Sequence, residues 1–331
     1  MRTMKYVAVI LTVGIMLAYV GCKNNSIVDP GSGPTTDKQA ITQMVQSDSL
    51  GEISSSDEDE MGDQGLFADD DSFDKTLVSI NPLRWGRQIT GIVRDVNVEV
   101  IGDSVATATI IKTISGNLIV AAAYTDTAHI ADTIISKPFT EKVERKVKFR
   151  RVARTYYYER NWIPVAITLV EGDSKPESNN LFTISSIEYT FPWGRDTVSD
   201  PLATWLRFAR LNNGVPVLKA GDSVDVRLTL TSTDPDTECA VLRYKALVAK
   251  PWTSYPVLRT RRVHMQLASS TAVGGSFERV YNGRFYAALG AFMTIGRFNA
   301  VVDVLSHGTL YDDGKPYSNR YWGLPYVVVW R

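Results

Sequence analysis

Cysteine and histidine are scarce in this chain. Its 331 residues include two cysteines, Cys22 and Cys239, and three histidines, His129, His264 and His307. The histidines are far apart, and none belongs to a His-x-His or His-Glu-x-x-His pattern, so the sequence predicts no metal site and no cofactor. A loop or surface position is expected for each histidine.

Nucleophile motifs are also missing. The chain has no Gly-x-Ser-x-Gly, which would mark a nucleophile elbow. Gly-Asp-Ser-Val occurs at 102–105 and 221–224 and resembles the block that holds the serine of GDSL hydrolases. No Asp-x-x-His partner follows near the C-terminus, and each copy precedes an alternating segment. We therefore expect turns at both places and no catalytic residues.

Basic and acidic residues cancel, with 36 of each. A chain without net charge gives no reason to expect nucleic acid as a partner. The charges are unevenly spread, however. Residues 137–154 hold eight basic side chains, whereas 52–74 hold no Lys or Arg and ten acids: Glu52, Asp57, Glu58, Asp59, Glu60, Asp63, Asp69, Asp70, Asp71 and Asp74. The acidic run lacks calcium-loop spacing, so we expect a solvated loop that can attract the basic segment.

The first 22 residues have the layout of a secretory signal. Arg2 and Lys5 precede an uncharged, mostly apolar run from 6 to 20, which is too short to cross a membrane as a helix. Tyr19-Val20-Gly21-Cys22 resembles the lipobox of bacterial lipoproteins, although Tyr19 departs from the usual leucine-like residue. The resemblance implies a signal peptide over 1–21, a lipid on Cys22 and an outer-membrane anchor. An ordinary signal with a chance cysteine is the alternative.

The single cysteine that remains after lipidation has no partner for an intramolecular disulfide. We expect Cys239 to be a small buried residue on a strand, and the exported domains to be stabilised by their cores alone.

The first half of the mature chain predicts a tether, a helix and then strands. Residues 22–36 are a polar Gly/Ser/Pro tether, and Asp37 is expected to cap a helix with one apolar stripe. From about Ile89 the apolar residues alternate with period two, and turns are expected at 102–103 and 115–117. This order of elements over 37–171 resembles the NTF2-like (cystatin-like) α+β fold.

The second half predicts strands throughout. A linker is expected at 172–180, which is rich in turn-forming residues. Several short alternating segments over 181–331 indicate a β-sandwich and resemble bacterial immunoglobulin-like domains. Strands are expected, among others, at 182–189, 224–230, 239–244, 263–267, 285–292, 298–304 and 326–330. The predicted fold class is therefore mainly β.

Two sets of residues are candidates for binding. One is a basic strand face for an anionic partner, formed by Lys142, Lys146, Lys148 and Arg150. The other is a group of aromatic residues expected in a loop, Tyr317, Tyr321 and Trp322, which could stack on a sugar or grip a protein. A charged exposed edge and aromatic packing onto the sandwich are the respective alternatives.

No catalytic constellation emerges from these patterns. The sequence therefore favours a non-enzymatic, lipid-anchored binding or assembly module of the cell envelope, with an envelope protein or glycan as partner. An envelope hydrolase with a site in the first domain and a carbohydrate-binding surface lipoprotein are the alternatives.

Overall fold

The structure is a computed structural model that describes residues 36–47, 67–68, 79–125, 130–208, 214–248, 257–290 and 293–330. It is mainly β, as predicted, with antiparallel sheets. The first half contains α1 (Asp37–Gln46), β1 (Phe67–Ala68), β2 (Asn81–Ile101), β3 (Val105–Ala123), β4 (Thr133–Arg151), η1 (Tyr158–Arg160), β5 (Trp162–Thr168), β6 (Val170–Lys175) and η2 (Glu177–Asn179). The second half contains β7 (Phe182–Phe191), β8 (Gly194–Val198), β9 (Trp205–Arg207), β10 (Val217–Lys219), β11 (Ser223–Ser232), β12 (Cys239–Val248), β13 (Val257–His264), β14 (Gln266–Val273), β15 (Ser276–Tyr286), β16 (Ile295–Leu305), α3 (His307–Tyr311) and β17 (Asn319–Val329).

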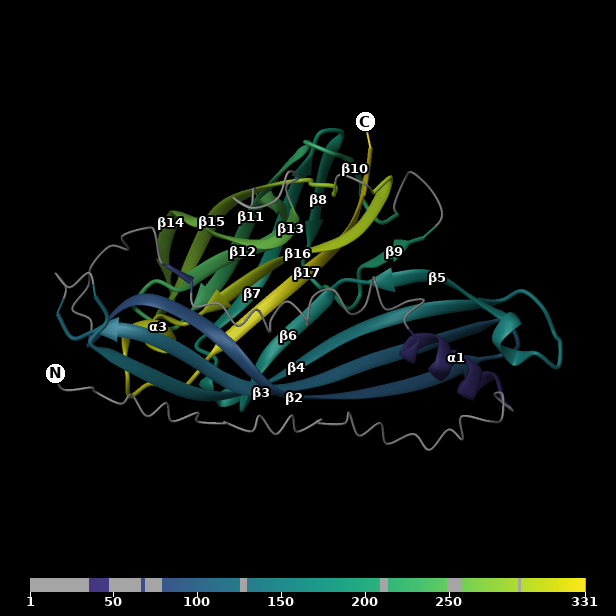
Figure 1. Cartoon of the computed structure of the whole chain (residues 1–331), viewed down its shortest axis with the longest axis horizontal. Coiled ribbons are helices and arrows are strands. Elements are labelled where there is room, and N and C mark those ends of the chain that lie inside the picture. Colours follow the sequence, from purple (N-terminus) through teal and green to yellow (C-terminus); the bar gives the residue numbers. More distant parts are fainter. Residues whose placement is uncertain are drawn as a thin grey trace, which may run out of the picture.

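The larger sheet, sheet A, contains strands from both halves of the chain. Its main path is β1-β2-β3-β4-β6-β17-β16-β12-β13, with β5, β9 and β10 paired beside it. The long strands β2, β3 and β4 curve along the length of the molecule (Figure 1). Side chains of β2–β4 meet those of β12, β16 and β17 in one apolar cluster, so the two parts of sheet A face each other.

The smaller sheet, sheet B, has the order β14-β15-β11-β7-β8. Its inward side chains pack on the other face of β12, β16 and β17 in a cluster that includes Leu228, Phe285, Val302 and Tyr326. Alternation in β11 buries Val224, Val226, Leu228 and Leu230, as the sequence predicted. These strands therefore form a β-sandwich with the second half of sheet A.

Helix α1 covers the end of β2–β4 that lies away from α3 (Figure 1). Its stripe is buried at Ala40, Ile41 and Val45. The predicted cap was one residue late, because the Thr36 side chain accepts the hydrogen bond from the Gln39 N–H at 3.2 Å. Asp37 in the first turn instead accepts from Trp162 Nε1 at 2.8 Å and pairs with Arg151.

Two of the expected turns are confirmed and one was wrong. Gly102 and Gly221 have φ of 58° and 93°, which only glycine adopts readily, and each precedes a strand. By contrast, β3 runs straight through Gly116. A Cβ there would lie 2.3 Å from the Gln88 carbonyl oxygen and 2.9 Å from Phe139 Cζ. Glycine at 116 allows a close approach within the sheet and makes no turn.

The segment expected as a linker is largely regular. Residues 172–175 belong to β6, which pairs with β4 on one side and β17 on the other, and 177–179 form η2. Gly172 lies against the Tyr321 ring, where a Cβ would be 2.0 Å from Cζ. The segments 37–171 and 181–331 therefore share sheet A.

Two predicted strands have different bounds. The expected strand 263–267 is divided at Met265, where the chain leaves β13 of sheet A and enters β14 of sheet B. The expected strand 285–292 was wrong for residues 287–290, because β15 ends at Tyr286, and residues 291–292 lie outside the described residues. Neither boundary is marked by proline or glycine, so composition gave no signal for it.

Several predictions concern residues outside this description. The signal, Cys22, the tether up to residue 35, His129 and almost all of the acidic segment 52–74 lie there; only Phe67 and Ala68, in β1, are described. In the described ranges, no helix combines the length and the apolar character needed to cross a bilayer. Cys239 is buried on β12, as predicted.

Candidate functional site

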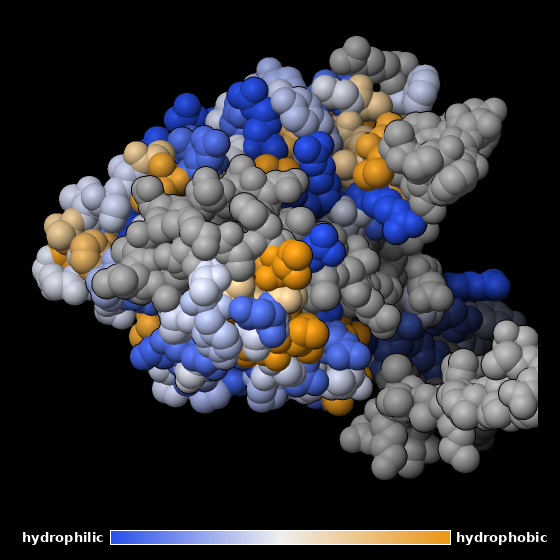
Figure 2. All heavy atoms as spheres, turned by 60° about the vertical axis from the view of Figure 1, so that its left-hand side comes forward, coloured by the Kyte–Doolittle hydropathy of each residue, from blue (hydrophilic) through white to orange (hydrophobic). Residues whose placement is uncertain are grey.

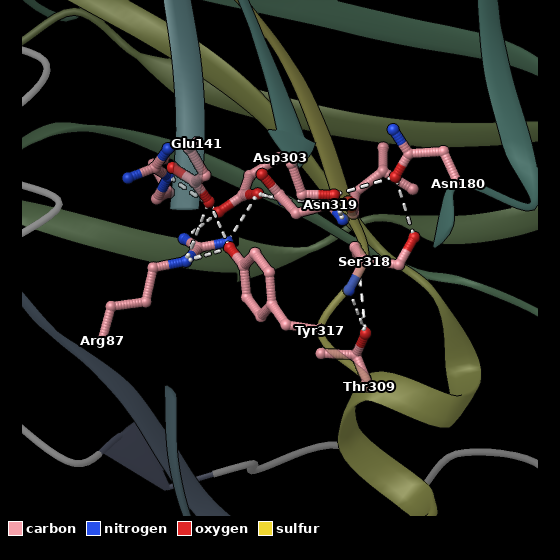
Figure 3. A network of polar contacts seen from close by, with 11 residues as sticks. Arg87, Glu141, Asn180, Asp303, Thr309, Tyr317, Ser318 and Asn319 are labelled. Carbon is pink, nitrogen blue, oxygen red and sulfur yellow. Dashed lines mark hydrogen bonds and ion pairs between the residues drawn. The ribbon is translucent and has the colours of Figure 1, made fainter. Parts of the chain in front are cut away.

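A buried ion pair lies where the two parts of sheet A face each other. Arg87 of β2 donates from Nη1 to Asp303 Oδ2 at 2.7 Å and from Nη2 to Asp303 Oδ1 at 3.1 Å (Figure 3). Both side chains are completely buried. Arg243 of β12 lies beside them, with Nε 3.2 Å from Asp303 Oδ2. Two arginines thus share one carboxylate in the interior.

Tyr317 connects this pair to a second carboxylate. Its hydroxyl accepts from Arg87 Nε at 2.7 Å and donates to Glu141 Oε1. The Tyr317 ring stacks on Phe139 with centroids 4.8 Å apart. Glu141 is also 3.7 Å from Arg87 Nε, so β2, β4, β16 and the segment before β17 are joined by charged and hydroxyl groups.

Burial and the neighbouring charges act in opposite senses on these groups. Burial alone would raise the pKa of Asp303, but Arg87 and Arg243 outweigh it and hold that pKa well below its usual range. For Glu141, burial prevails over the nearby Arg87, and the pKa is raised. The pKa of Arg87 is raised because Asp303, Tyr317 and Glu141 outweigh its burial.

The polar contacts continue from this cluster to the surface. Asn319 donates from Nδ2 to Asp303 Oδ1 and to the Val304 carbonyl, and its N–H donates to Ser174 Oγ at 3.0 Å. Ser174 and Ser318 both donate to Asn180 Oδ1, at 2.8 and 3.1 Å (Figure 3). Ser318 is at the wall of a pocket. The pocket wall is therefore fixed to the buried ion pair.

The pocket has a volume of about 560 Å³ and lies beside α3 and η2. Most of the residues that line it have polar side chains. It is lined by Ser79, Ser178, Asn179, Leu181, Thr233, Asp234, Pro235, Asp236, Ser306, His307, Gly308, Tyr311, Asp312, Lys315, Pro316 and Ser318. Such a size suits a small polar ligand or a short polar segment of a larger one.

His307 contributes an imidazole ring to the pocket. It stacks on Tyr311 with centroids 4.5 Å apart, and its Nδ1 lies 3.8 Å from Asp236 Oδ2. Burial lowers the pKa of His307, and Asp236 and Asp234 oppose that shift without cancelling it. The imidazole is thus neutral at pH 7 and can donate from one nitrogen and accept at the other.

Arg279 of β15 holds the opposite wall of the pocket. Its guanidinium donates to the carbonyls of Asp234, Pro235 and Asp236 and to Glu238 Oε1, all within 2.9 Å. Asp236 N–H also donates to Asp234 Oδ1 at 3.1 Å, which is the hydrogen bond of an Asx turn. This loop is therefore held rigidly before any ligand binds.

Lys137 of β4 holds α3 in place through hydrogen bonds. Its Nζ donates to the Gly308 carbonyl at 2.9 Å and to the Asp312 carbonyl. Burial lowers the pKa of Lys137 to about 8, while Asp312 and Asp313 oppose the shift. The ammonium thus satisfies carbonyl groups at the end of a short helix.

The predicted basic face exists, but its charges are partly engaged. The four side chains alternate with buried Val143, Val147 and Phe149 along β4. Lys142 pairs with Glu144 at 3.0 Å, and Lys148 lies 4.4 Å from the centre of the Trp205 ring. Lys146 is half-buried and Arg150 is exposed. The structure does not join these residues to the pocket.

The expectation of an exposed aromatic loop at Tyr317, Tyr321 and Trp322 was wrong. All three are buried, and the latter two lie in β17. Tyr321 contacts the apolar cluster of sheet A, and Trp322 packs against sheet B. The alternation of β17 places them on opposite faces, so they cannot form one stacking platform.

The sequence missed the polar residues of the core. Glu141 and Arg145 are in phase with Val143 and Val147 on the buried face of β4, and Arg87 and Lys112 are buried on β2 and β3. The sequence did contain one indication: these charged residues stand at positions of an alternating strand where apolar residues are expected. Within the described ranges, no set of three acidic, histidine or cysteine side chains is arranged to hold a metal ion.

Comparison of the chain with protein-family models, with curated proteins and with solved structures found no match.

Proposed function

We propose that the chain is an exported lipoprotein, anchored through a lipid on Cys22, whose folded part is a non-enzymatic binding module of the cell envelope. The pocket beside α3 is its binding site, for a polar ligand such as an envelope glycan or a polar segment of an envelope protein. The observation that carries this proposal is the pocket itself, with walls held by Arg279, Lys137 and Ser318. Rigid walls lower the ordering cost of binding.

The finer fold assignment is part of the same proposal. An NTF2-like unit over 37–171 is supported by one helix packed on a curved antiparallel sheet. An immunoglobulin-like unit over 181–331 is supported by the sandwich of sheet B on β12, β16 and β17. Binding without catalysis is common to many domains of both architectures.

Polar recognition in the pocket is favoured over a broad apolar contact on the face that Figure 2 shows. There, hydrophobic residues lie in small groups between hydrophilic ones. The pocket offers hydroxyls, amides, three aspartates, Lys315 and the neutral His307 ring. These groups suit a ligand with several hydroxyl or amide groups.

A hydrolase is the second candidate because His307 lies 3.8 Å from Asp236 in the pocket. A nucleophilic mechanism needs a hydroxyl or thiol that donates to the histidine. Three of the four pocket serines are engaged elsewhere: Ser79 donates to the Tyr311 carbonyl at 3.1 Å, Ser306 Oγ contacts Thr309 Oγ1 at 2.9 Å, and Ser318 donates to Asn180. Any such enzyme would use His307 to activate water, with Asp236 as its orienting group.

The anchor is tested by the mass of the protein purified from membranes. Lipidation predicts an N-terminus at Cys22 that carries acyl chains, and Cys22→Ser is expected to remain unlipidated and unprocessed. An unmodified cysteine in the mature wild-type protein would reject the anchor.

The binding site is tested with the chain that lacks residues 1–22. Soluble envelope glycan fragments and peptides are titrated by calorimetry, and partners are captured from envelope extracts and eluted across a salt gradient. His307→Ala with Asp236→Asn is expected to lose binding, whereas Arg195→Ala, an exposed change on β8, keeps it. Equal binding by both variants would reject the pocket, and hydrolysis of a titrated fragment would favour the enzyme.

A further inference from the structure

An aromatic and basic surface lies at the end of the molecule that carries α1. It consists of the turn between β2 and β3 and the loop between β4 and β5, which lie together at the right of Figure 1. We call it the tip surface. Its exposed apolar residues are Ile101 (55% exposed), Val152 (50%), Tyr156 (98%) and Tyr157 (61%). Its exposed basic residues are Arg150, Arg154 and Arg160.

The tip surface is presented by an ordered loop. Asn161 is buried, accepts at Oδ1 from the Thr155 N–H at 2.8 Å and donates from Nδ2 to the Thr155 carbonyl at 3.0 Å. The Val152 N–H donates to the Asn161 carbonyl at 2.7 Å. Arg154 joins this loop to Asp103 of the β2–β3 turn at 2.9 Å. The outward position of Tyr156 is therefore set by the fold.

The composition of this loop suits a lipid headgroup layer. Residues 150–160 contain four arginines, three consecutive tyrosines and one acid, Glu159. The Arg160 guanidinium lies 4.9 Å from the centre of the Tyr157 ring. Tyrosine rings favour the boundary between acyl chains and headgroups, and arginines interact with lipid phosphates. A fully exposed tyrosine beside basic groups satisfies both preferences.

The tether begins at the same end of the molecule. Asp37 is fixed to Trp162 and Arg151, which flank the loop, and 14 residues separate it from Cys22. A fully extended chain of that length reaches roughly 50 Å at most. A lipid on Cys22 would therefore hold this end of the fold within roughly 50 Å of the membrane.

We infer that the tip surface rests on an anionic lipid bilayer, with Tyr156 and Tyr157 in the interface and the arginines on phosphate groups. The inference depends on the proposed anchor for the distance argument, whereas the chemistry of the surface is independent of it. This orientation directs the pocket beside α3 away from the membrane, toward ligands at a distance from it.

The test is co-flotation of the chain lacking residues 1–22 with vesicles. All described contacts lie between Thr36 and Trp330, so this deletion leaves them in place. The vesicles contain phosphatidylcholine alone or phosphatidylcholine mixed with phosphatidylglycerol. Binding to the anionic vesicles is expected, with weakening as salt is raised.

A triple variant and a matched control locate the contact. Tyr156→Ser with Arg150→Gln and Arg160→Gln removes one ring and two charges, and is expected to weaken partitioning at least roughly tenfold. Trp193→Ser with Arg195→Gln removes an exposed aromatic from the β7–β8 turn and an exposed arginine from β8, and should bind like wild type. All changed side chains are largely exposed, so thermal unfolding should be little altered.

Three results would overturn the inference. The first is that the wild-type chain does not bind anionic vesicles, and the second is that both variants lose vesicle binding equally. The third is that a protein partner from envelope extracts covers the tip surface while the chain does not bind vesicles. Mass measurement of the N-terminal residue Cys22 shows independently whether the lipid anchor is present. If the protein is lipidated but the chain lacking residues 1–22 does not bind vesicles, the anchor is supported and the tip contact is rejected. If the protein is not lipidated but binds anionic vesicles, the tip contact is supported and the anchor is rejected.

Discussion

Arg87 and Asp303 are 216 residues apart in the chain and form a two-pronged ion pair with both side chains fully buried. Loss of Arg87 would remove two charge-assisted hydrogen bonds from buried Asp303 and leave it with Arg243 as its remaining cationic neighbour. Arg87→Met is therefore expected to lower the free energy of unfolding by about 3–5 kcal/mol. Urea unfolding followed by circular dichroism measures the change.

The matched double variant tests whether the loss of stability comes from breaking the buried ion pair. Arg87→Met with Asp303→Leu should be less destabilised than the sum of the two single variants. An additive result would contradict this reading. Arg195→Ala, which removes a mostly exposed pair with Glu188, should change stability by no more than about 0.5 kcal/mol.

Acid should weaken the fold through Asp303. Its pKa is lower in the folded protein than the ordinary value of 3.8, so the unfolded chain takes up the proton first. The stabilisation is complete above that value and is lost as the pH falls below it, with a slope of up to about 1.4 kcal/mol per pH unit.

Glu141 acts in the opposite sense, because its pKa is raised above the ordinary 4.5. Its contribution is complete below that value and is lost as the pH rises through the folded pKa. Urea unfolding across this range, with wild type and Glu141→Gln, is the measurement. The variant should lose less stability than wild type as the pH rises, and an identical pH profile would show that Glu141 titrates normally.

Gly172 of β6 should be difficult to replace. A Cβ at this position would lie 2.0 Å from Tyr321 Cζ, so Gly172→Ala is expected to cost about 3 kcal/mol in thermal or urea unfolding. Gly194→Ala is the control, since nothing lies within 4 Å of its Cβ position. Adding Tyr321→Leu to Gly172→Ala should cost less than the two changes summed, because the ring that clashes is gone.

The His307 ring should titrate below its ordinary pKa of 6.5, because burial penalises the imidazolium. Its neutral form contributes stability that is complete above 6.5 and is lost as the pH falls. Asp236→Asn should lower the pKa further, since Asp236 favours the charged ring. NMR titration of the ring protons measures both values. A higher pKa in the variant would contradict the proposed charge interaction.

The period-two pattern predicted strands well because alternation is local. It placed Val143, Val147 and Phe149 on one face of β4, and they are buried. The same pattern could not show that Glu141 and Arg145 are buried on that face, since their partners come from β2, β16 and the segment before β17. Charged side chains enter a core only when distant residues pair with them, and a single strand carries no record of those residues.

The pocket was invisible for a related reason. Asp234 and Asp236 belong to the loop after β11, whereas His307 opens α3 after β16. Only the pairing of β12 with β16 brings the two segments together. The tip surface is different: its tyrosines and arginines all lie within residues 150–160, but the sequence singled out only Arg150 as a candidate, because no motif contains the others.

Strand β17 is the last strand that the structure describes, yet it pairs with β6, β10 and β16 and supplies residues to both large cores. Before β17 is in place, β6 lacks its second neighbouring strand. The aromatic side chains that pack against β17 also remain exposed to water. Closure over so long a separation is slow, and open strand edges invite aggregation in the meantime. The chain should therefore require a holding chaperone until β17 is available for pairing.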